Sequence, residues 1–472
     1  MKFTSSYLSL PSTFYRLSKA AAFPRLKLLK VNESLAQEIG FPLSSFSKDE
    51  LLNFFSGQAS LPEAEPMALA YAGYQFGHPV ESLGDGRALL MGEIGGFDFQ
   101  LKGSGQTPFS RRGDGRSALG PVVREYLLSE AMHALGVPTT RALAMVLTGE
   151  NVFRQNGPEP GGIFSRIAPS HLRVGTFQYF YFKQDLESIK ALLQYSIKRH
   201  YPELLKMEPL KNQALHFLKE FAQRQGDLIA EWSSLGFIHG VMNTDNCAIG
   251  GFTIDYGPCA FMEEFRFQQV FSSIDERGRY SYFNQVPIIQ WNILRLADTL
   301  LPLLAETTEA GIKLVEDEII PLLQTFPERR LKRMAKKLGI DDFTSEDGEL
   351  VISFLTYLEE ESLDFTLSFR KLPELYRGEM DFYPDTQRRN DFLIRWRKRV
   401  QRVDHLSRIN PLYIPRNHLV QKAIELSYQG DLSFFEKCLT VFSNPFEEQE
   451  GMSEFSLPAK ESEKVLKTFC GT

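Results

Sequence analysis

The fold prediction rests on the stretch HGVMNTDNCAIGGFTIDYG, residues 239–257. Its Gly250-Gly251 pair lies between short runs of strand-forming residues and predicts a tight β-hairpin. Counting outward from this turn sets Asn246 opposite Asp255. Opposed residues in a hairpin have Cβ atoms about 4.5 to 5.5 Å apart, so two side-chain oxygens can share one hard cation. The stretch therefore predicts a metal site formed by Asn246 and Asp255.

A second hairpin is predicted in GRALLMGEIGGFDFQLKG, residues 86–103. A turn at Gly95-Gly96 pairs Lys102 with Leu89, close to the turn Gly84-Asp85-Gly86. Strand alternation separates the polar from the apolar residues of the second arm: Asp98, Gln100 and Lys102 share one face, and Phe99 and Leu101 take the other. The pattern thus brings a lysine next to a glycine turn.

A helix is predicted over PVVREYLLSEAMHALG, residues 121–136, because proline is tolerated in a first turn and Gly136 precedes Val137-Pro138. Its apolar residues run nearly all the way round, so we expect the helix to be buried. Glu125 and Glu130 inside it then need partners. Lys102 is the candidate partner for one of them.

These polar groups follow one another as in a kinase-like phosphotransferase: a glycine turn, a strand lysine, a helix glutamate, an Asn and an Asp. In such enzymes an Asp after His-Arg or His-Gly accepts the hydroxyl proton. Here Val241 stands at that position. A polar hairpin with a capping Asp is the alternative without chemistry. Agreement of several positions with one geometry favours the kinase-like interpretation.

SRRGDGRS, residues 110–117, is compatible with three structures: a phosphate clamp, a solvated loop or a nucleic-acid patch. The chain has 472 residues, 43% of them apolar, and a net charge of −6. This composition supports a folded core and argues against a protein built mainly to hold nucleic acid. We therefore favour the clamp over the solvated loop.

The remaining bulk features predict a cytoplasmic protein. No apolar run approaches the roughly 18 residues of a membrane span. Four cysteines in 472 residues do not make a disulfide scaffold. The basic amino terminus resembles a transit sequence, but Phe14, Tyr15 and Pro24 are typical of folded sequence. We expect neither a membrane nor a nucleic acid as partner.

The chain resembles the selenoprotein O family of pseudokinases. The resemblance extends from LPSTFYRL near the amino terminus over most of the chain, and the combination of matching stretches is specific. The stretches are YAGYQFG (71–77), LGDGRALLMGE (83–93), LKGSGQTPFSRRGDGRS (101–117), VREYLLSEAMHALGVPTTRAL (123–143), SRIAPSHLRVGTFQYF (165–180), HGVMNTDNCAIGGFTIDYGP (239–258), RGRYSYFNQ (277–285) and NPLYIPRNHLVQKAI (410–424).

The resemblance implies an α+β, bilobal protein-kinase-like fold. Residues 1–70 would be an N-terminal extension packed on the core, and residues 71–165 a β-rich nucleotide-binding lobe. Residues 166–290 would be the metal-binding and catalytic lobe. Residues 291–472 would be a mainly helical C-terminal region with a cysteine-containing tail.

The resemblance also implies that ATP binds in reversed orientation and that AMP passes to Ser, Thr or Tyr hydroxyls of proteins, with pyrophosphate leaving. The nucleotide would contact Gly84, Gly86, Arg87, Lys102, Asp114, Gly115, Arg166, Arg173 and Asp255. Glu125 would orient Lys102. Asn246 and Asp255 would bind Mg²⁺ or Mn²⁺, and Asp245 would accept the proton. We expect the protein to be a monomer.

The family commonly carries Cys or selenocysteine third from the end, and Cys470 occupies that place. A partner cysteine of bacterial relatives would fall near Phe271, where this chain has none. Cys259 is the nearest substitute, so a redox pair of Cys259 with Cys470 is one prediction. Two ordinary reduced cysteines are the other.

Three alternative functions stay open. A phosphotransferase of the aminoglycoside-kinase type shares the His-Gly and Asp-x-Gly elements, but it would need an Asp at position 241. UMP transfer from UTP is the second, because the sequence does not identify the base pocket. The third is an inert nucleotide-binding scaffold.

Overall fold

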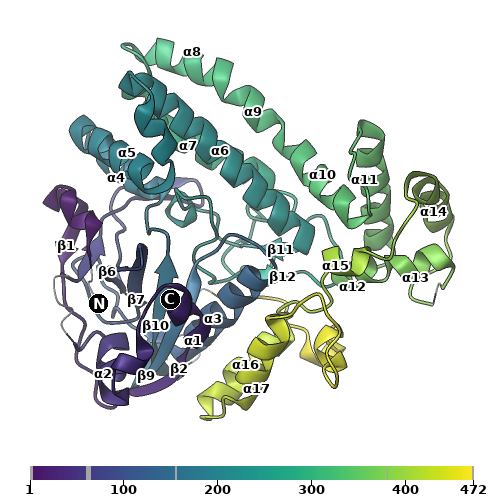
Figure 1. The fold of residues 1–472 in the computed structure, drawn as a ribbon, viewed down its shortest axis with the longest axis horizontal. Helices are drawn as coiled ribbons and strands as arrows, with labels where there is room; N and C mark the ends of the chain where they lie inside the picture. The colour runs from purple at the N-terminus through teal and green to yellow at the C-terminus, as the bar shows by residue number, and fades with distance from the viewer. Residues whose placement is uncertain (1–3, 60–64, 155–156, 380, 470–472) are drawn as a thin grey trace.

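The computed structural model of the chain describes residues 4–59, 65–154, 157–379 and 381–469. Within these residues, eight strands form one antiparallel sheet beside a large set of helices (Figure 1). Along the sheet lie β1 (Tyr15–Leu17), β3 (Met67–Leu69), β6 (Ala88–Ile94), β7 (Phe97–Lys102), β10 (Gly157–Ala168), β9 (Arg141–Arg154) and β2 (Lys27–Val31), with β8 (Ser117–Ala118) paired to β10. The predicted mixture of a β-rich part and many helices is confirmed.

The hairpin of β6 and β7 turns at Gly95-Gly96 as predicted, but its register shifts along the strands. Near the turn Glu93 faces Asp98, as expected. An irregularity between Leu90 and Gly92 then displaces the pairing, so Lys102 faces Ala88. The predicted partner, Leu89, was wrong by one residue. A bulge adds one residue to a strand, and counting from a turn does not anticipate it.

Helices cover both faces of the sheet. On one face, α1 (Glu33–Glu38) and α2 (Lys48–Phe55) pack their apolar side chains against Phe99 and Leu101 of β7. On the other, α3 (Leu119–Ala134) lies along β9 and β10. From the far end of the chain, α16 (Asn417–Tyr428) and α17 (Ser433–Phe442) come back to pack on α3 (Figure 1). Both faces of the sheet are therefore buried.

Helix α3 is the predicted helix, displaced by two residues toward the amino terminus. It ends at Ala134, and Gly136 has a φ of +82°, the left-handed conformation of a helix stop. Glu125 faces the sheet and is buried. Glu130 binds Arg141 at 2.9 Å, so both glutamates have partners. The expectation that the helix is buried is met.

Most of the remaining chain is helical and forms two further cores. The first core gathers α4 (Val174–Phe182), α5 (Leu186–His200), α6 (Leu210–Leu235) and α7 (Gln285–Leu304), with α8 (Thr308–Glu318) and α9 (Ile320–Gln324) at its edge. The second gathers α10 (Phe326–Lys337), α11 (Ser345–Glu360), α12 (Phe365–Arg370), α13 (Leu372–Arg377), α14 (Gln387–Arg399) and α15 (Leu406–Ile409). Helices α13 and α14 lie at the end of the molecule away from the sheet (Figure 1).

Two pairs of short strands lie outside the large sheet. Strand β4 (Gly73–Gln75) pairs with β5 (His78–Val80), and β11 (Phe237–Ile238) pairs with β12 (Ala260–Phe261). The single-turn helix η5 (Thr244–Asn246) follows β11. Among the described residues, no helix has both the length and the apolar character that a membrane crossing requires. The division of the chain into four segments stays a prediction. The large sheet takes strands from residues 15–69, which were assigned to the N-terminal extension, as well as from residues 88–168.

Candidate active site

Lys102, the last residue of β7, lies between two carboxylates. Its Nζ is 2.6 Å from Glu125 Oε2 and also contacts Asp255 Oδ1. Lys102 is 9% exposed and Glu125 3% exposed, so these charges are largely removed from water. Ion pairs in such surroundings are held in one geometry by their partners. The lysine on the strand and the glutamate on α3 thus meet as the sequence predicted.

A chain of buried polar groups extends this pair across the sheet. Arg166 on β10 donates to Glu125 Oε1 at 2.9 Å and to Gln100 Oε1 at 2.6 Å. Gln100 in turn donates to Asp85 Oδ2 at 3.1 Å. Arg173 NH2 lies 3.7 Å from Asp85 Oδ1. Two arginines and a lysine are therefore anchored by buried carboxylates along one face.

Asp255 is held in an unusual state by this network. Burial alone would raise the pKa of its carboxyl, but the charges of Lys102 and Arg166 outweigh burial and hold the pKa well below its usual range. Its backbone φ is +69°, a left-handed conformation that is uncommon for residues other than glycine. Strain of this kind costs roughly 1 to 3 kcal/mol and persists where the surroundings enforce it. Asp255 is a fixed anion at the edge of the network.

Asp245 lies in η5, which is attached to β4. The N–H of Tyr74 donates to Thr244 Oγ1 at 2.8 Å, and the N–H of Phe76 donates to Asn243 Oδ1 at 3.0 Å. This attachment needs a residue without a side chain at position 73, because a Cβ there would lie 2.5 Å from Asp245 Oδ1. The glycine of YAGYQFG makes room for the carboxylate of Asp245.

The carboxylate of Asp245 is buried without full pairing. Burial raises its pKa to about 6, although the charge of Arg173 acts in the opposite direction. Its Oδ1 is enclosed and has no hydrogen-bond partner within the described part of the chain. A buried acceptor without a donor is costly, and such groups gather at functional sites.

Asn246 and Asp255 line the same cavity, but not through the predicted hairpin. A turn forms where the glycines predicted it, with the N–H of Gly251 donating to Ala248 O at 3.1 Å. The two arms then bridge to other segments: Ala248 to Arg173, and Thr253 to Thr139. The predicted ladder is wrong because each arm finds a neighbour from outside the stretch.

The side chain of Asn246 is oriented by the backbone. Its Nδ2 donates to Val241 O at 3.0 Å, which leaves the amide oxygen to act as a ligand. Among the described residues, no group of three or more His, Cys, Asp or Glu gathers as a metal centre would require. A cation held by Asn246 and Asp255 would therefore need further oxygens, such as those of a phosphate.

His239 has a structural role here. It is fully buried, its ring stacks on Trp232, and its Nε2 lies 3.0 Å from Ile254 O. This contact connects His239, two residues before Val241, to Ile254, the residue directly before Asp255. Burial lowers the pKa of His239, so the neutral ring donates one hydrogen bond to that carbonyl.

Two adjoining cavities collect nearly all predicted site residues. The inner one measures about 400 Å³ and is lined by Gly86, Arg87, Lys102, Arg166, Arg173, Asp245, Asn246 and Asp255, among others. The outer one measures about 550 Å³ and is lined by Gly84, Gly86, Arg87, Asp114, Gly115 and Asp245, among others. Glu125 lines neither and lies behind Lys102. Arginines line both cavities: Arg166 and Arg173 line the inner one, and Arg112, Arg116 and Arg154 line the outer one.

Several lining residues were not among the predicted site residues. Tyr71 stacks under the guanidinium of Arg173, with its ring centre 4.3 Å from Cζ. Arg154, from β9, binds Asp114 at 2.8 Å. Gln75 and Arg111 line both cavities. Tyr71 and Gln75 lie in the matching stretch YAGYQFG, and Arg111 lies in SRRGDGRS, the stretch predicted as a phosphate clamp. Arg154 lies in a stretch without a motif.

Comparison with known proteins assigns the chain to a family. The family model described as protein adenylyltransferase SelO matches residues 1–443. The chain belongs to the SelO family. The predicted resemblance is confirmed, and so is the expectation of an enzyme, because SelO proteins are transferases.

Curated SelO relatives match over their whole length. A protein nucleotidyltransferase YdiU of Agrobacterium fabrum is 46% identical over all of this chain and all of its own. A protein of the same name from Rhizobium meliloti is also 46% identical, over all of this chain and 99% of its own. A third, from Rhizobium leguminosarum, is 44% identical over all of this chain and 97% of its own.

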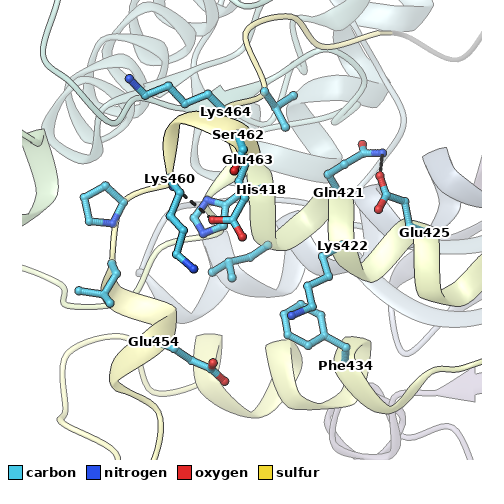
Figure 2. Close-up of a pocket in the computed structure, with 14 residues that line it drawn as sticks. His418, Gln421, Lys422, Glu425, Phe434, Glu454, Lys460, Ser462, Glu463 and Lys464 are labelled. Carbon is cyan, nitrogen blue, oxygen red and sulfur yellow. Dashed lines mark hydrogen bonds between the residues drawn. The ribbon is translucent and has the colours of Figure 1, made fainter.

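A separate cavity of about 670 Å³ lies between α16, α17 and residues 454–465. Figure 2 shows the side chains of His418, Lys422 and Lys460 at its wall. No predicted site residue lines it. The redox prediction for Cys470 falls outside the described residues, whereas Cys259 is fully buried and forms no disulfide with another described cysteine.

Proposed function

We propose that the protein transfers AMP from ATP to Ser, Thr or Tyr hydroxyls of other proteins. The hydroxyl oxygen attacks the α-phosphorus, the bond from that phosphorus to the oxygen bridging to the β-phosphate breaks, and pyrophosphate leaves. The hydroxyl proton passes to Asp245. Membership of the SelO family supports a nucleotidyl transfer, and the arrangement of the cavities supports the details.

The observation that carries the proposal is the location of Asp245. Position 241, where a kinase-like enzyme keeps its base, holds a valine that is 4% exposed. Asp245 instead lines both cavities, next to Asn246, with one carboxylate oxygen enclosed and without a donor. Its raised pKa, about 6, suits a group that takes up a proton near neutral pH. We therefore propose Asp245 as the base, at a different place from that of the base of a kinase.

We propose that ATP binds in reversed orientation, with its β- and γ-phosphates at the cations of the inner cavity. Arg166, Arg173 and Lys102 line the inner cavity, where guanidinium groups can hold the β- and γ-phosphates in bidentate fashion. As pyrophosphate leaves, these cations neutralise the charge that develops. Gly84, Gly86, Arg87, Asp114 and Gly115 would hold the rest of the nucleotide. In this orientation the α-phosphate lies nearest to Asp245.

The residues present fit a hard divalent cation. Asp255 is an anion and Asn246 has its amide oxygen available, and both line the inner cavity. We propose that these two residues would hold Mg²⁺ or Mn²⁺, which would supply positive charge to offset the charge of the phosphates. Glu125 keeps Lys102 oriented toward the phosphates.

The same proposal includes the large-scale arrangement. The sheet with α3 corresponds to the nucleotide lobe of a protein kinase, and the helices from α4 onward correspond to the larger lobe. The four segments of the sequence analysis are retained in this scheme. We propose a monomer that acts in the cytoplasm.

Labelled ATP tests the proposal directly. The purified protein is incubated with a bacterial lysate, Mg²⁺ and ATP carrying ³²P at either the α or the γ position. We expect transfer of the α label alone, and its loss in Asp245→Asn. Asp227→Asn, on the exposed side of α6, is the matched control and should keep full activity. Transfer of the γ label alone would show phosphotransfer instead, and transfer of neither would show an inert scaffold.

Replacing ATP by UTP in the same experiment tests which nucleobase the site accepts. Transfer from α-labelled UTP at a higher rate than from ATP would replace AMP by UMP in the proposal. Equal loss of transfer from both nucleotides in Asp245→Asn would show that one site serves both.

A further inference from the structure

Ile274 is an exposed aliphatic side chain at the rim of the inner cavity. It lines that cavity together with Asp245 and Asn246, and it is 52% exposed. The apolar neighbours in the lining differ from it, since Ala88 and Val241 are buried. Among the described lining residues of the inner cavity, Ile274 is the one large aliphatic side chain that faces solvent.

The backbone on both sides holds Ile274 in this exposed place. The carboxylate of Asp275 accepts hydrogen bonds from the N–H groups of Arg279 and Tyr280, at 2.8 and 2.7 Å. On the other side, Thr468 pairs with Ser272 and receives a hydrogen bond from the N–H of Ser273 at 2.9 Å. The exposure of Ile274 is therefore enforced by fixed neighbours.

The phosphates and the cation of the proposed complex do not need this side chain. Phosphates and a cation are bound by charged and polar groups, and these line the interior of the cavity. An aliphatic group at the rim gains free energy only when another apolar group covers it. The molecule that must pass this rim is the one that brings the hydroxyl to Asp245.

We propose that Ile274 determines substrate specificity by packing against an apolar residue beside the hydroxyl that accepts AMP. The substrate class is then a protein segment in which Ser, Thr or Tyr has an aliphatic or aromatic residue within two positions. This inference rests on the proposed function, because it concerns the acceptor of the same reaction. Ile274 does not touch the reacting atoms, so it positions the acceptor.

Mapping of the modified sites tests the inference. Wild type, Ile274→Asp, Ile274→Leu and Ile394→Asp are each incubated with ATP and a bacterial lysate, and the AMP-carrying peptides are sequenced by mass spectrometry. Ile394, 57% exposed on α14 and far from the sheet, is the matched control. Thermal shift with ATP in all four proteins measures nucleotide binding separately.

We expect wild type, Ile274→Leu and Ile394→Asp to share an enrichment of apolar residues beside the modified hydroxyl. In Ile274→Asp this enrichment should fall about fivefold, as expected for losing the burial of roughly half an isoleucine side chain. ATP binding should be equal in all four proteins.

Three other outcomes are decisive. If wild type transfers AMP and Ile274→Asp modifies sites with the same flanking residues, the inference is wrong and the proposed function stands. If Ile274→Asp loses ATP binding, Ile274 has a structural role and the inference is wrong. If wild type transfers no AMP to any protein, the proposed function fails and the inference fails with it.

Discussion

At the scale of single residues, the site depends on a few side chains that neighbours hold in costly states. Asp255 keeps a left-handed backbone and a half-buried carboxylate beside Lys102. Asp245 keeps an enclosed oxygen without a donor. Local strain and unpaired buried groups persist where the rest of the fold enforces them. Substitution of these residues should therefore affect activity more than stability.

Asp255→Asn should abolish transfer while leaving the fold intact. Asn tolerates the left-handed conformation, and Lys102 still has Glu125 as a partner. The loss of the anion should lower the rate of AMP transfer about 100-fold or more, because charge stabilisation in a dry site is a large term. The assay is transfer from α-labelled ATP, with the unfolding midpoint measured in parallel. A variant that keeps more than half of the wild-type rate would remove Asp255 from the proposed site.

Gly73→Ala tests a residue that the sequence did not single out. A Cβ at position 73 would lie 2.5 Å from Asp245 Oδ1, so the carboxylate must move. A displacement of about 1 Å at a reacting group can cost about 100-fold in rate, and we expect a loss of that order. Activity is measured by transfer of the α label.

The matched control for Gly73→Ala is Gly348→Ala in α11. There the new Cβ would meet Leu331 Cδ1 at 3.4 Å, an ordinary contact. The control should keep wild-type activity and gain a few tenths of a kcal/mol in stability, up to about 1 kcal/mol. Equal activity in both variants would show that Asp245 does not need its present position.

At the scale of elements, ion pairs of the buried Arg416 join the C-terminal helices to the segment after β12. Arg416, before α16, is fully buried and binds Asp364 at 2.7 Å and Glu263 at 3.2 Å. Glu263 lies two residues after β12, on the segment that follows Asp255. This cluster links the C-terminal helices to the segment that leaves the active site. Because charges hold this cluster together, we expect its contribution to the stability of the protein to fall in acid.

Glu263→Gln should destabilise the protein at neutral pH and much less in acid. Burial alone would raise the pKa of Glu263, but His418, whose Nδ1 lies 3.5 Å from Oε1, and the charge of Arg416 outweigh burial, so the pKa is lowered. The stabilisation is complete above the unfolded-state value of about 4.5 and is lost as pH falls through the folded-state pKa. We expect a difference of about 1.5 to 3 kcal/mol at pH 7.

Urea unfolding of wild type and Glu263→Gln at several pH values between 7 and the acid limit of the native state gives this difference. We expect the difference in the free energy of unfolding between the two proteins to become smaller in acid, because protonated Glu and Gln then carry the same charge. A difference in the free energy of unfolding that stays constant with pH would show that the cluster acts through packing alone.

At the scale of the whole molecule, the site draws its residues from a long stretch of chain. The cavities are lined by residues from Tyr71 to Ile274, and the C-terminal helices α16 and α17 cover α3, which carries Glu125. Binding a ligand in such a site stabilises the native state as a unit. The stability of the molecule should therefore report on the nucleotide and the cation.

ATP with Mg²⁺ should raise the unfolding temperature. At 100 times the dissociation constant, binding adds about 2.7 kcal/mol, which corresponds to a shift of a few degrees for a protein of this size. Addition of EDTA should remove most of the shift, because ATP without the cation leaves its phosphates facing Asp255. Differential scanning fluorimetry measures both effects. An equal shift with and without EDTA would contradict the proposed role of Asn246 and Asp255.

The sequence predicted those parts of the site that depend on neighbours along the chain. The period of strand β7 set Lys102 on the polar face, and the apolar circumference of α3 required a partner for Glu125. The glycine pairs marked both turns correctly. These predictions held because side-chain direction within one strand or helix follows from local geometry.

Contacts between distant segments were decided only by the tertiary structure. The irregularity in β6 shifted the strand partner of Lys102 by one residue. The arms on either side of Gly250-Gly251 pair with Arg173 and Thr139 instead of with each other. The burial of Asp245 needed Gly73, more than 150 residues earlier in the chain. Such contacts depend on how whole elements pack against one another, and the packing of a core is not contained in the pattern of any single element.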